Sequence, residues 1–484
     1  MLVVVVDQWP LWVYERDKAL FTGAFARLAR DAAFARAELP YASTFTACGH
    51  AAIGTGAPPA VSGVVGNQWW RRDEAKEQPA EYDPASPVLA LGGGTVKETG
   101  SSRALRVEGT ADALRRATGG RAHSIAIALK ARAAVFVAGQ HPDLAVWYEA
   151  AAGGMTTSTA YAQTAPAWLA QLARDKPADR FLAETWQPRD AALLARQTGI
   201  ADAMPGEGGQ MGMTAAFPHA VGDAKILVHT PFADQLVMDA ALASLDAMQL
   251  GTHDVPDLLA VSFNAHDYAG HVWGPDSWEV LDLTLRLDAL LGQLFDELDR
   301  RLGRTGWAVV LTSDHGATPI VERAKIPGSR RIPPAEIAAA AGGDVFVSSG
   351  NIYLTKVPQD LNAIAAKVAA VPNIAAVGQT APMIGHCDEQ EALFRAICLA
   401  IVPGEAGELF VIPQRGSLIS EFTSGTHHDA PFDDNRFVPL FVMAPGLAPQ
   451  QGTASLLQVA PTVAALLGIP PPDHATERPL FGLH

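Results

Sequence analysis

The feature that most constrains the fold is the alternation of short apolar runs with helix-patterned segments along most of the chain. The first run, Leu2–Val6, is continuous and β-branched, as is typical of a strand buried on both faces of a parallel sheet. Similar runs at 258–263 and 307–311 are separated from their neighbours by segments with helical spacing. This alternation predicts an α/β fold, a three-layer α/β/α arrangement with a doubly wound, mostly parallel sheet.

The remaining elements divide the chain into a main body and an insert. Residues 1–335 and 417–484 are expected to form the main body, with a surface excursion at about 71–104. Residues 336–416 have a ββαβαβ order and predict a small α+β insert, or cap, domain. Asp276-Ser277-Trp278-Glu279 has the form of a capping box at the start of a helix that ends near residue 302. Further strands are expected at 124–129, 134–138, 144–148 and 438–443, and further helices at 21–37, 110–118, 231–250 and 456–467.

Composition excludes several classes of protein. The net charge of −15 argues against a general nucleic-acid binder, although a local cationic site could still hold a small anion. No apolar run reaches the ~20 residues that a membrane-spanning helix needs. The N-terminus lacks the pattern of a signal peptide, so we expect either a cytoplasmic protein or a chain already trimmed. The three cysteines, Cys48, Cys387 and Cys398, exclude a disulfide framework, and free thiols are favoured over a Cys387–Cys398 bridge.

Residues 41–56, YASTFTACGHAAIGTG, combine reactive side chains with glycines. The pattern predicts a loop that enters a helix, with a hydroxyl or a thiol at the helix N-terminus, where free N–H groups can bind an anion. An ordinary N-capped helix fits the stretch equally well. Local sequence does not distinguish the four candidate nucleophiles, which are Ser43, Thr44, Thr46 and Cys48.

Aspartate and histidine gather where the predicted strands end. Taken singly, each is as well explained by a turn, a cap or a surface pair. Together they would lie at one edge of one sheet, and carboxylate with imidazole is the usual zinc ligand set without thiolates. The residues concerned are Asp7, His266, Asp267, His271, Asp314, His315, His427 and His428. Lys130 and Arg132 end the 124–129 strand at the same edge, and alternation in a strand would point both cations to one side, as in a phosphate clamp.

These motifs, in this order, resemble the alkaline phosphatase superfamily. Within it the chain is most similar to the bacterial alkaline phosphatases with a threonine nucleophile, relatives of the type I phosphodiesterase/nucleotide pyrophosphatase group. The resemblance covers nearly the whole main body. It is carried by Asp7 and by five motifs: TACGH at 46–50, GNQWW at 66–70, LKAR at 129–132, DYAGH at 267–271 and SDHG at 313–316.

Residue by residue, the resemblance implies two zinc ions and a threonine nucleophile. Asp267, His271 and His428 would hold one ion, and His428 fits the family's loop spacing better than His427. The other ion would be held by Asp7, Thr46, Asp314 and His315. Thr46 fits as the nucleophile because it lies four residues before His50 and 21 before Asn67. Asn67, Lys130, Arg132 and a backbone N–H near Ala47 would bind the phosphate oxygens.

The implied activity is zinc-dependent hydrolysis of small phosphate monoesters through a phospho-threonine intermediate. Zinc would lower the pKa of the threonine hydroxyl, so that no histidine base is needed and His50 is expected to be structural. Lys130, Arg132 and Asn67 favour the monoesterase branch, because diesterases leave room for a second ester group. Cys48 and Gln68 depart from the family pattern, as does the insert.

Other interpretations stay open. The main alternative is a phosphodiesterase or nucleotide pyrophosphatase on the same scaffold, and a remote one is a metal-binding interaction protein without catalytic activity. A sulfatase is disfavoured because no C-x-P-x-R or S-x-P-x-R stretch is present. The resemblance further implies a periplasmic or secreted protein, monomeric or weakly oligomeric, with no nucleic-acid or membrane partner.

Overall fold

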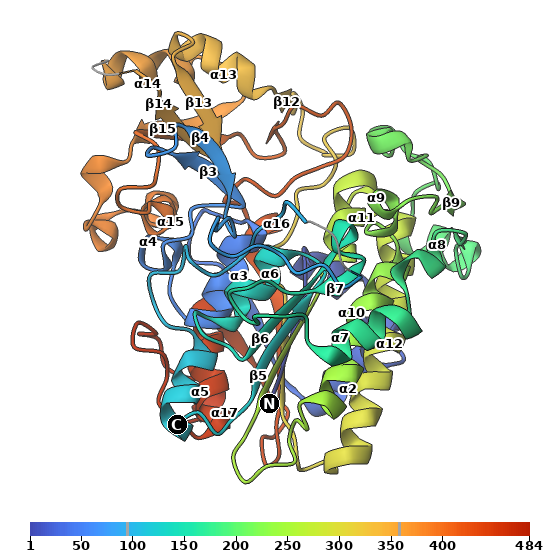
Figure 1. Ribbon diagram of the computed structural model, residues 1–484. Helices are drawn as coiled ribbons and strands as arrows, with labels where there is room; N and C mark the ends of the chain where they lie inside the picture. The colour runs from blue at the N-terminus through green and yellow to red at the C-terminus, as the bar shows by residue number, and fades with distance from the viewer. Residues whose placement is uncertain (93–95, 357–359) are drawn as a thin grey trace.

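The computed structural model describes residues 1–92, 96–356 and 360–484 (Figure 1). A nine-stranded sheet in the order β19-β2-β18-β11-β1-β10-β5-β6-β7 forms its centre. The five strands from β11 to β6 run parallel, whereas β18 and β7 pair antiparallel with their neighbours. The expected mostly parallel sheet is therefore confirmed. The strand bounds are β1 Leu2–Val6, β2 Ala33–Glu38, β5 Ser124–Ala128, β6 Leu144–Glu149, β7 Gly154–Thr156, β10 Leu258–Phe263, β11 Val309–Thr312, β18 Phe437–Met443 and β19 Gln451–Ser455.

The central strand β1 is divided between two hydrophobic cores because successive side chains point to opposite faces of the sheet. Leu2, Val4 and Val6 belong to one core, and Val3 and Val5 belong to the other. None of the five is more than 4% exposed. Full burial of each such side chain contributes about 1.5–3 kcal/mol. The apolar run thus fixes β1 at the middle of the molecule and its last residue at the sheet edge.

Helices cover both faces of the sheet, as the alternation predicted (Figure 1). One face carries α10 (Pro231–Ala247) and α12 (Trp278–Leu302), and the other carries α3 (Thr46–Thr55), α6 (Ala131–Ala138) and α17 (Val459–Leu467). Small residues let α3 approach its neighbours closely, since a Cβ on Gly54 would lie 2.7 Å from the Phe136 carbonyl oxygen. The α12 N-cap is Ser277, which accepts from the Val280 N–H, one residue later than the expected cap at Asp276.

Two elements differ from the sequence-based expectation. Residues 134–138 form part of α6 rather than a strand, because a short apolar run buried on all sides has the same composition in either element. Residues 21–37 divide into α2 (Ala24–Asp31) and β2. The alanine-rich second half pairs with β18 and β19, so tertiary pairing overrides helix propensity there.

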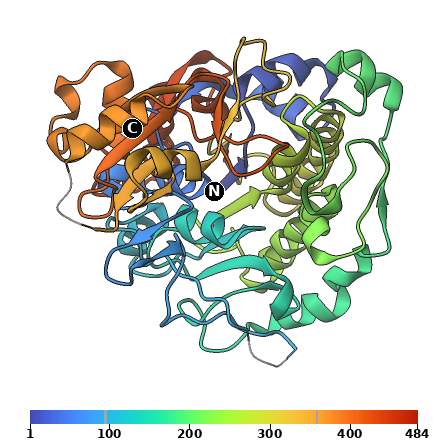
Figure 2. The same cartoon turned by 90° about the horizontal axis from the view of Figure 1, so that it is seen from above.

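The insert, defined here as residues 345–413, has the expected ββαβαβ order. Its four-stranded antiparallel sheet has the order β13-β14-β16-β15, with α14 and α15 packed beside it. The insert lies over the α3 and α6 side of the main sheet rather than over α10 and α12 (Figure 2). The element bounds are β13 Val345–Ser348, β14 Asn351–Leu354, α14 Leu361–Ala369, β15 Ile374–Gln379, α15 Ala392–Ala400 and β16 Leu409–Pro413.

The insert contains a disulfide between Cys387 and Cys398, so the expectation of two free thiols was wrong. The count of cysteines did not reveal that a short 3₁₀ turn and α15 bring these two residues to a Cα separation of 5.3 Å. Cys48 is free and buried.

A hairpin of β3 (Gln68–Arg71) and β4 (Lys76–Pro79) lies at the start of the expected surface excursion and contacts the insert. The Ser349 hydroxyl donates to the Gln68 carbonyl at 2.9 Å, and the Trp70 and Phe346 rings lie 5.2 Å apart. Within the described residues, no helix is both long enough and apolar enough to cross a membrane.

Candidate active site

The carboxyl ends of β1, β10 and β11 meet at one edge of the sheet, where ligands bind in open α/β folds. Asp7 directly follows β1, and Asp314 and His315 follow β11 after one residue. After β10 the chain enters α11 (Ala265–Trp273), whose first turns carry Asp267 and His271. The structure thus brings together the side chains that the sequence placed at separate strand ends.

The first group of side chains, which we call the deep set, consists of Asp7, Asp314, His315 and Thr46. His315 Nε2 lies 3.5 Å from Asp7 Oδ1, 3.4 Å from Asp314 Oδ2 and 3.5 Å from Thr46 Oγ1. All four residues are fully buried. Four ligand-type atoms from two strand ends and one helix therefore converge on one point.

Among the described residues, two carboxylate oxygens of the deep set accept no hydrogen bond. Asp7 Oδ1 and Asp314 Oδ2 are both buried and face His315, and Asp314 Oδ2 also lies 3.1 Å from His50 Nδ1. Burial raises the pKa of the Asp7 carboxyl, and the negative charges of Asp267 and Asp314 raise it further. A buried oxygen without a donor is costly, and a metal cation would satisfy both oxygens and the excess negative charge.

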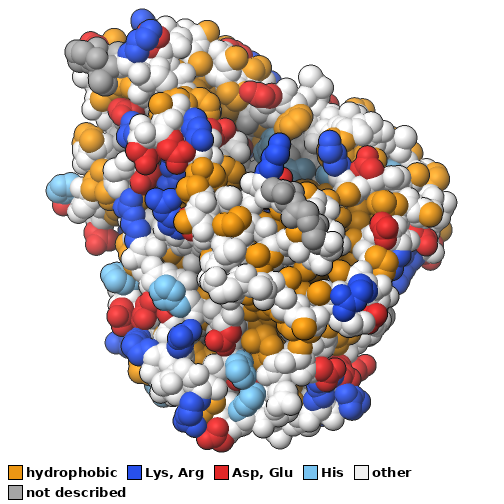
Figure 3. All heavy atoms as spheres, viewed as in Figure 1, with side chains coloured by type: hydrophobic (Ala, Val, Ile, Leu, Met, Phe, Trp, Pro, Cys, Tyr) orange, Lys and Arg blue, Asp and Glu red, His pale blue; other side chains and the backbone are white. Residues whose placement is uncertain are grey.

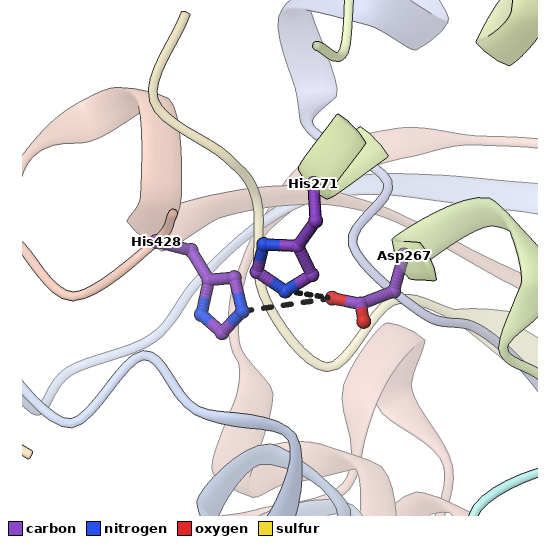
Figure 4. A group of neighbouring side chains, drawn as sticks. All are labelled: Asp267, His271 and His428. Atoms are coloured by element: carbon purple, nitrogen blue, oxygen red, sulfur yellow. Dashed lines mark ion pairs between the residues drawn. The ribbon is translucent and has the colours of Figure 1, made fainter. Parts of the chain in front are cut away.

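The second group, the outer set, consists of Asp267, His271 and His428 (Figure 4). Asp267 Oδ1 lies 3.3 Å from His271 Nε2 and 3.5 Å from His428 Nε2. These three residues can hold a metal ion, and a second such group is formed by Asp7, Asp267 and His315. The two sets are adjacent, because the rings of His315 and His428 stack with centroids 3.8 Å apart.

All three histidines of these sets present the same ring nitrogen to the site. Nδ1 of His271 lies 2.8 Å from the Thr426 carbonyl, and Nδ1 of His315 lies 2.9 Å from the Gly316 carbonyl. Nδ1 of His428 bonds to the Thr44 carbonyl. A carbonyl only accepts, so each Nδ1 carries a proton and each Nε2 is the ring nitrogen that faces the site. This backbone arrangement is the one that fixes metal-binding histidines in proteins.

Lys130 lies between the two sets. Its ammonium donates to Asp7 Oδ2 at 2.8 Å, also donates to Asp267, and lies 3.4 Å from Thr46 Oγ1. Burial opposes the charged form of Lys130, but Asp267 and Asp7 together raise its pKa. Lys130 is therefore a buried cation held within reach of the threonine hydroxyl.

The expected geometry of the Lys-x-Arg pair was wrong, although both cations lie near the site. Lys130 is the N-cap of α6 and Arg132 lies inside that helix, so the two do not alternate along a strand. Burial lowers the pKa of Arg132, but the acidic groups around it, of which Glu81 has the largest effect, together raise it. The charges of Asp267 and Asp7 raise the pKa of Arg132 as well, so its guanidinium lies within the electrostatic range of these carboxylates.

Helix α3 begins at Thr46, as the sequence predicted, and its first turn faces both sets. A Cβ on Gly49 would lie 2.3 Å from the Asp314 carbonyl oxygen, so only glycine permits this approach. The Ala47 N–H, expected to bind phosphate, donates to Asn67 Oδ1 at 3.0 Å. This bond holds Asn67 next to Thr46 and leaves the Asn67 amide hydrogens as its donors.

Two of the other three candidate nucleophiles, Thr44 and Cys48, make bonds elsewhere. The Thr44 hydroxyl donates to the His428 carbonyl, and the Cys48 thiol contacts the Val64 carbonyl at 3.3 Å. Burial raises the pKa of Cys48 well above its ordinary value, which disfavours a thiolate. His50 is buried, with Nδ1 near the Thr46 carbonyl and Nε2 bonded to Ser262 Oγ. The geometry leaves Thr46 as the hydroxyl that faces the ligand-type atoms.

Sequence reasoning missed two supporting residues. Gln8 has a left-handed backbone (φ 60°), and its Nε2 donates to Asp267 Oδ1 at 2.8 Å. Asn264 donates to Asp7 Oδ2 at 2.7 Å and accepts the N–H groups of Leu129 and Lys130. Gln8 follows Asp7 at the end of β1, and Asn264 directly follows β10. This position at a strand end is the sequence signal that could have identified both residues.

Comparison with known proteins agrees with this geometry. The family model for type I phosphodiesterase / nucleotide pyrophosphatase matches residues 1–426. Alkaline phosphatase PhoV of Synechococcus elongatus is 29% identical over 509 aligned residues, which cover 97% of this chain and 90% of that protein. Alkaline phosphatase PafA of Elizabethkingia meningoseptica is 26% identical, covering 99% and 93%.

A solved structure supports the fold independently. The crystal structure of wild-type PafA superposes with a TM-score of 0.90 at 24% identity, covering 99% of this chain and 98% of that one. The chain belongs to the type I phosphodiesterase / nucleotide pyrophosphatase family.

Proposed function

We propose that the protein is a metal-dependent phosphate monoester hydrolase that uses Thr46 as its nucleophile. The observation that carries this proposal is the convergence of Thr46 Oγ1, two unpartnered carboxylate oxygens and His315 Nε2 at one buried point. The similarity to alkaline phosphatases over nearly the whole chain supports the same reaction class.

The donor set fits zinc, because nitrogen and carboxylate oxygen ligands without thiolates are common at catalytic zinc sites. We infer two zinc ions, one held by the deep set and one by the outer set. Bound there, they would supply Lewis acidity that lowers the pKa of a hydroxyl and stabilises developing negative charge.

The side chains of this chain position the phosphate for in-line attack. Thr46 Oγ attacks phosphorus and loses its proton to water, the bond between phosphorus and the ester oxygen breaks, and that oxygen takes a proton from water to leave as the alcohol. The product is phospho-Thr46. Attack of water on phosphorus then releases phosphate and restores the hydroxyl. Asn67 donates from its amide to a phosphate oxygen, while Lys130 and Arg132 neutralise the charge on the others. Because the transition state for phosphoryl transfer is loose, this positioning and charge stabilisation carry most of the rate enhancement.

The second candidate function is phosphodiester or nucleotide pyrophosphate hydrolysis, which the family assignment itself favours. The buried cation Lys130 supports the monoesterase, since a monoester dianion offers one more charged oxygen than a diester. A small diester would place an ester group where that charge is needed.

One experiment tests the proposal. We expect the purified protein to hydrolyse phenyl phosphate faster than bis-phenyl phosphate, to lose both activities with chelator and to recover them with zinc. Faster turnover of the diester would identify the alternative function. Bound metal without either activity would favour the metal-binding interaction protein.

An exported location is supported by the disulfide of the insert, since disulfides persist in oxidising compartments such as the periplasm. We therefore propose a periplasmic or secreted enzyme that acts on small phosphate esters.

A further inference from the structure

Two strongly exposed hydrophobic side chains lie on loops that contact the outer set. Six large hydrophobic residues are exposed in the part of the chain that the structure describes, and two of them, Met211 and Phe422, are the most exposed at 53% each. Single exposed apolar residues are ordinary in soluble proteins. What distinguishes these two is that they lie on two loops that meet at His271.

Hydrogen bonds join these two loops to each other and to the metal-binding helix turn. Gln210 Nε2 donates to the Ser424 carbonyl at 3.2 Å and to the His271 carbonyl at 3.5 Å. The Thr426 N–H also donates to the His271 carbonyl, at 2.9 Å. Ser424 Oγ in turn donates to the Gly208 carbonyl at 2.7 Å. The loops that carry Met211 and Phe422 are thus fixed relative to the outer set.

A row of three rings leads from the outer set to the surface. The His427 ring lies 5.0 Å from that of His271 on one side. On its other side it stacks with Phe422, with centroids 6.0 Å apart and an interplanar angle of 27°. On the face drawn in Figure 3, the surface is hollowed between the insert and the lobe that carries α9 (Ala224–Leu227) and α11, and histidine atoms are visible in the hollow. The three rings therefore form an aromatic edge that runs from His271 of the outer set to the exposed Phe422.

We propose that His427, Phe422 and Met211 form a subsite for an aromatic leaving group of the phosphate ester. The inference rests on the proposed function, because in-line attack by Thr46 of the deep set expels the ester oxygen on the opposite side, toward the outer set. A group attached to that oxygen must extend away from the buried deep set, because Asp7, Asp314 and His315 have no exposed surface. The exposed edge beside the outer set consists of rings and a thioether, which favour a planar apolar group.

The test compares esters that differ only in the leaving group. Replacing Phe422 by Ala is expected to lower the ratio of kcat/KM for phenyl phosphate to kcat/KM for glycerol phosphate by about fivefold, the scale of one aromatic contact. Phe422→Tyr is expected to keep the wild-type ratio because it retains the ring. The matched control is Phe394→Ala, which removes an exposed phenylalanine of α15 in the insert.

A second measurement is independent of turnover. The ratio of the Kd for methylphosphonate to that for phenylphosphonate, measured by calorimetry on the zinc-loaded protein, is expected to fall in Phe422→Ala by about the same fivefold. Unchanged ratios in both assays, or an equal drop in Phe394→Ala, would overturn the subsite. Wild-type protein that hydrolyses neither ester would instead refute the proposed function, and the phosphonate ratio would then decide the subsite alone.

Discussion

The deep and outer sets contain the same kinds of ligand but are built differently. The side chains of Asp7, Asp314 and His315 are 0% exposed, and each follows a central strand. In the outer set His271 is 24% exposed and stands on one turn of α11. His428 comes from a loop without regular structure and is held mainly by its bonds to Thr44.

The deep ligands are therefore expected to be held more rigidly than the outer ligands. Moving Asp7, Asp314 or His315 requires moving β1, which pairs with β10 and β11, or β11, which pairs with β1 and β18, in the middle of the sheet. Moving an outer ligand requires only the opening of a loop or a helix turn, which costs less than global unfolding. We therefore expect the nucleophile to depend on the deep set and the leaving group to depend on the outer one.

The largest expected effect comes from Thr46→Ala, which removes the proposed nucleophile but none of the carboxylate or imidazole ligands. We expect monoester turnover to fall on the order of 10⁴-fold or more, as for other nucleophile deletions. Metal content, measured by plasma emission spectroscopy, should stay close to that of the wild type. Ser43→Ala is the matched control, a hydroxyl removed from the same loop. Turnover of Thr46→Ala near the control's would refute the assignment.

The next effect concerns the cations beside both sets. Removing Lys130 and Arg132 together, each to Ala, should lower kcat/KM for phenyl phosphate by roughly 10²–10³-fold, the scale of lost charge stabilisation in a buried site. The loss for bis-phenyl phosphate should be about tenfold, because the diester has one charged oxygen fewer. Arg121→Ala, at an exposed arginine, is the control. Equal losses on both esters would instead point to the diesterase function.

Much of the site could be predicted because it follows from strand patterning. The run Leu2–Val6 places Asp7 at the sheet edge without any knowledge of neighbouring strands. Asp267 and His271 are four residues apart, a spacing that predicts one face of a helical turn, and α11 provides that turn. The roles of these residues stay predictions, whereas their juxtaposition is observed.

The parts that could not be predicted depend on contacts between distant segments. The positive φ of Gln8 and its bond to Asp267 leave no periodic signal. Residues 134–138 were misassigned because burial on all sides erases the periodicity that separates helix from strand. The disulfide could not be predicted because it depends on packing, since the position of α15 brings Cys398 to Cys387.

Chelation tests the difference between the sets more finely. If two zinc ions bind, the ion of the outer set should leave first, because its ligand His271 is partly exposed and the deep ligands are not. We expect rates that differ by about tenfold, equivalent to ~1.4 kcal/mol in opening free energy. Stopped-flow measurement with a chromogenic chelator would resolve two phases. A single phase releasing both ions would mean that the sets open together.

The smallest expected effect is that of the insert on zinc release from the outer set. The disulfide holds Cys398 of α15, and the nearby Ala396 carbonyl in that helix accepts the Ala42 N–H at 2.8 Å. Two residues further on, Thr44 bonds to His428, so loosening α15 should displace this outer ligand through residues 42–44.

Replacing Cys387 and Cys398 together by Ser should lower the stability of the insert by about 2–3 kcal/mol, as expected for an 11-residue separation. The fast phase of zinc release should then accelerate about threefold while the slow phase stays unchanged. Cys48→Ala, at the buried free thiol, is the control for loss of sulfur. Acceleration of both phases would show that the insert stabilises the whole site, and the distinction between the two sets would fail.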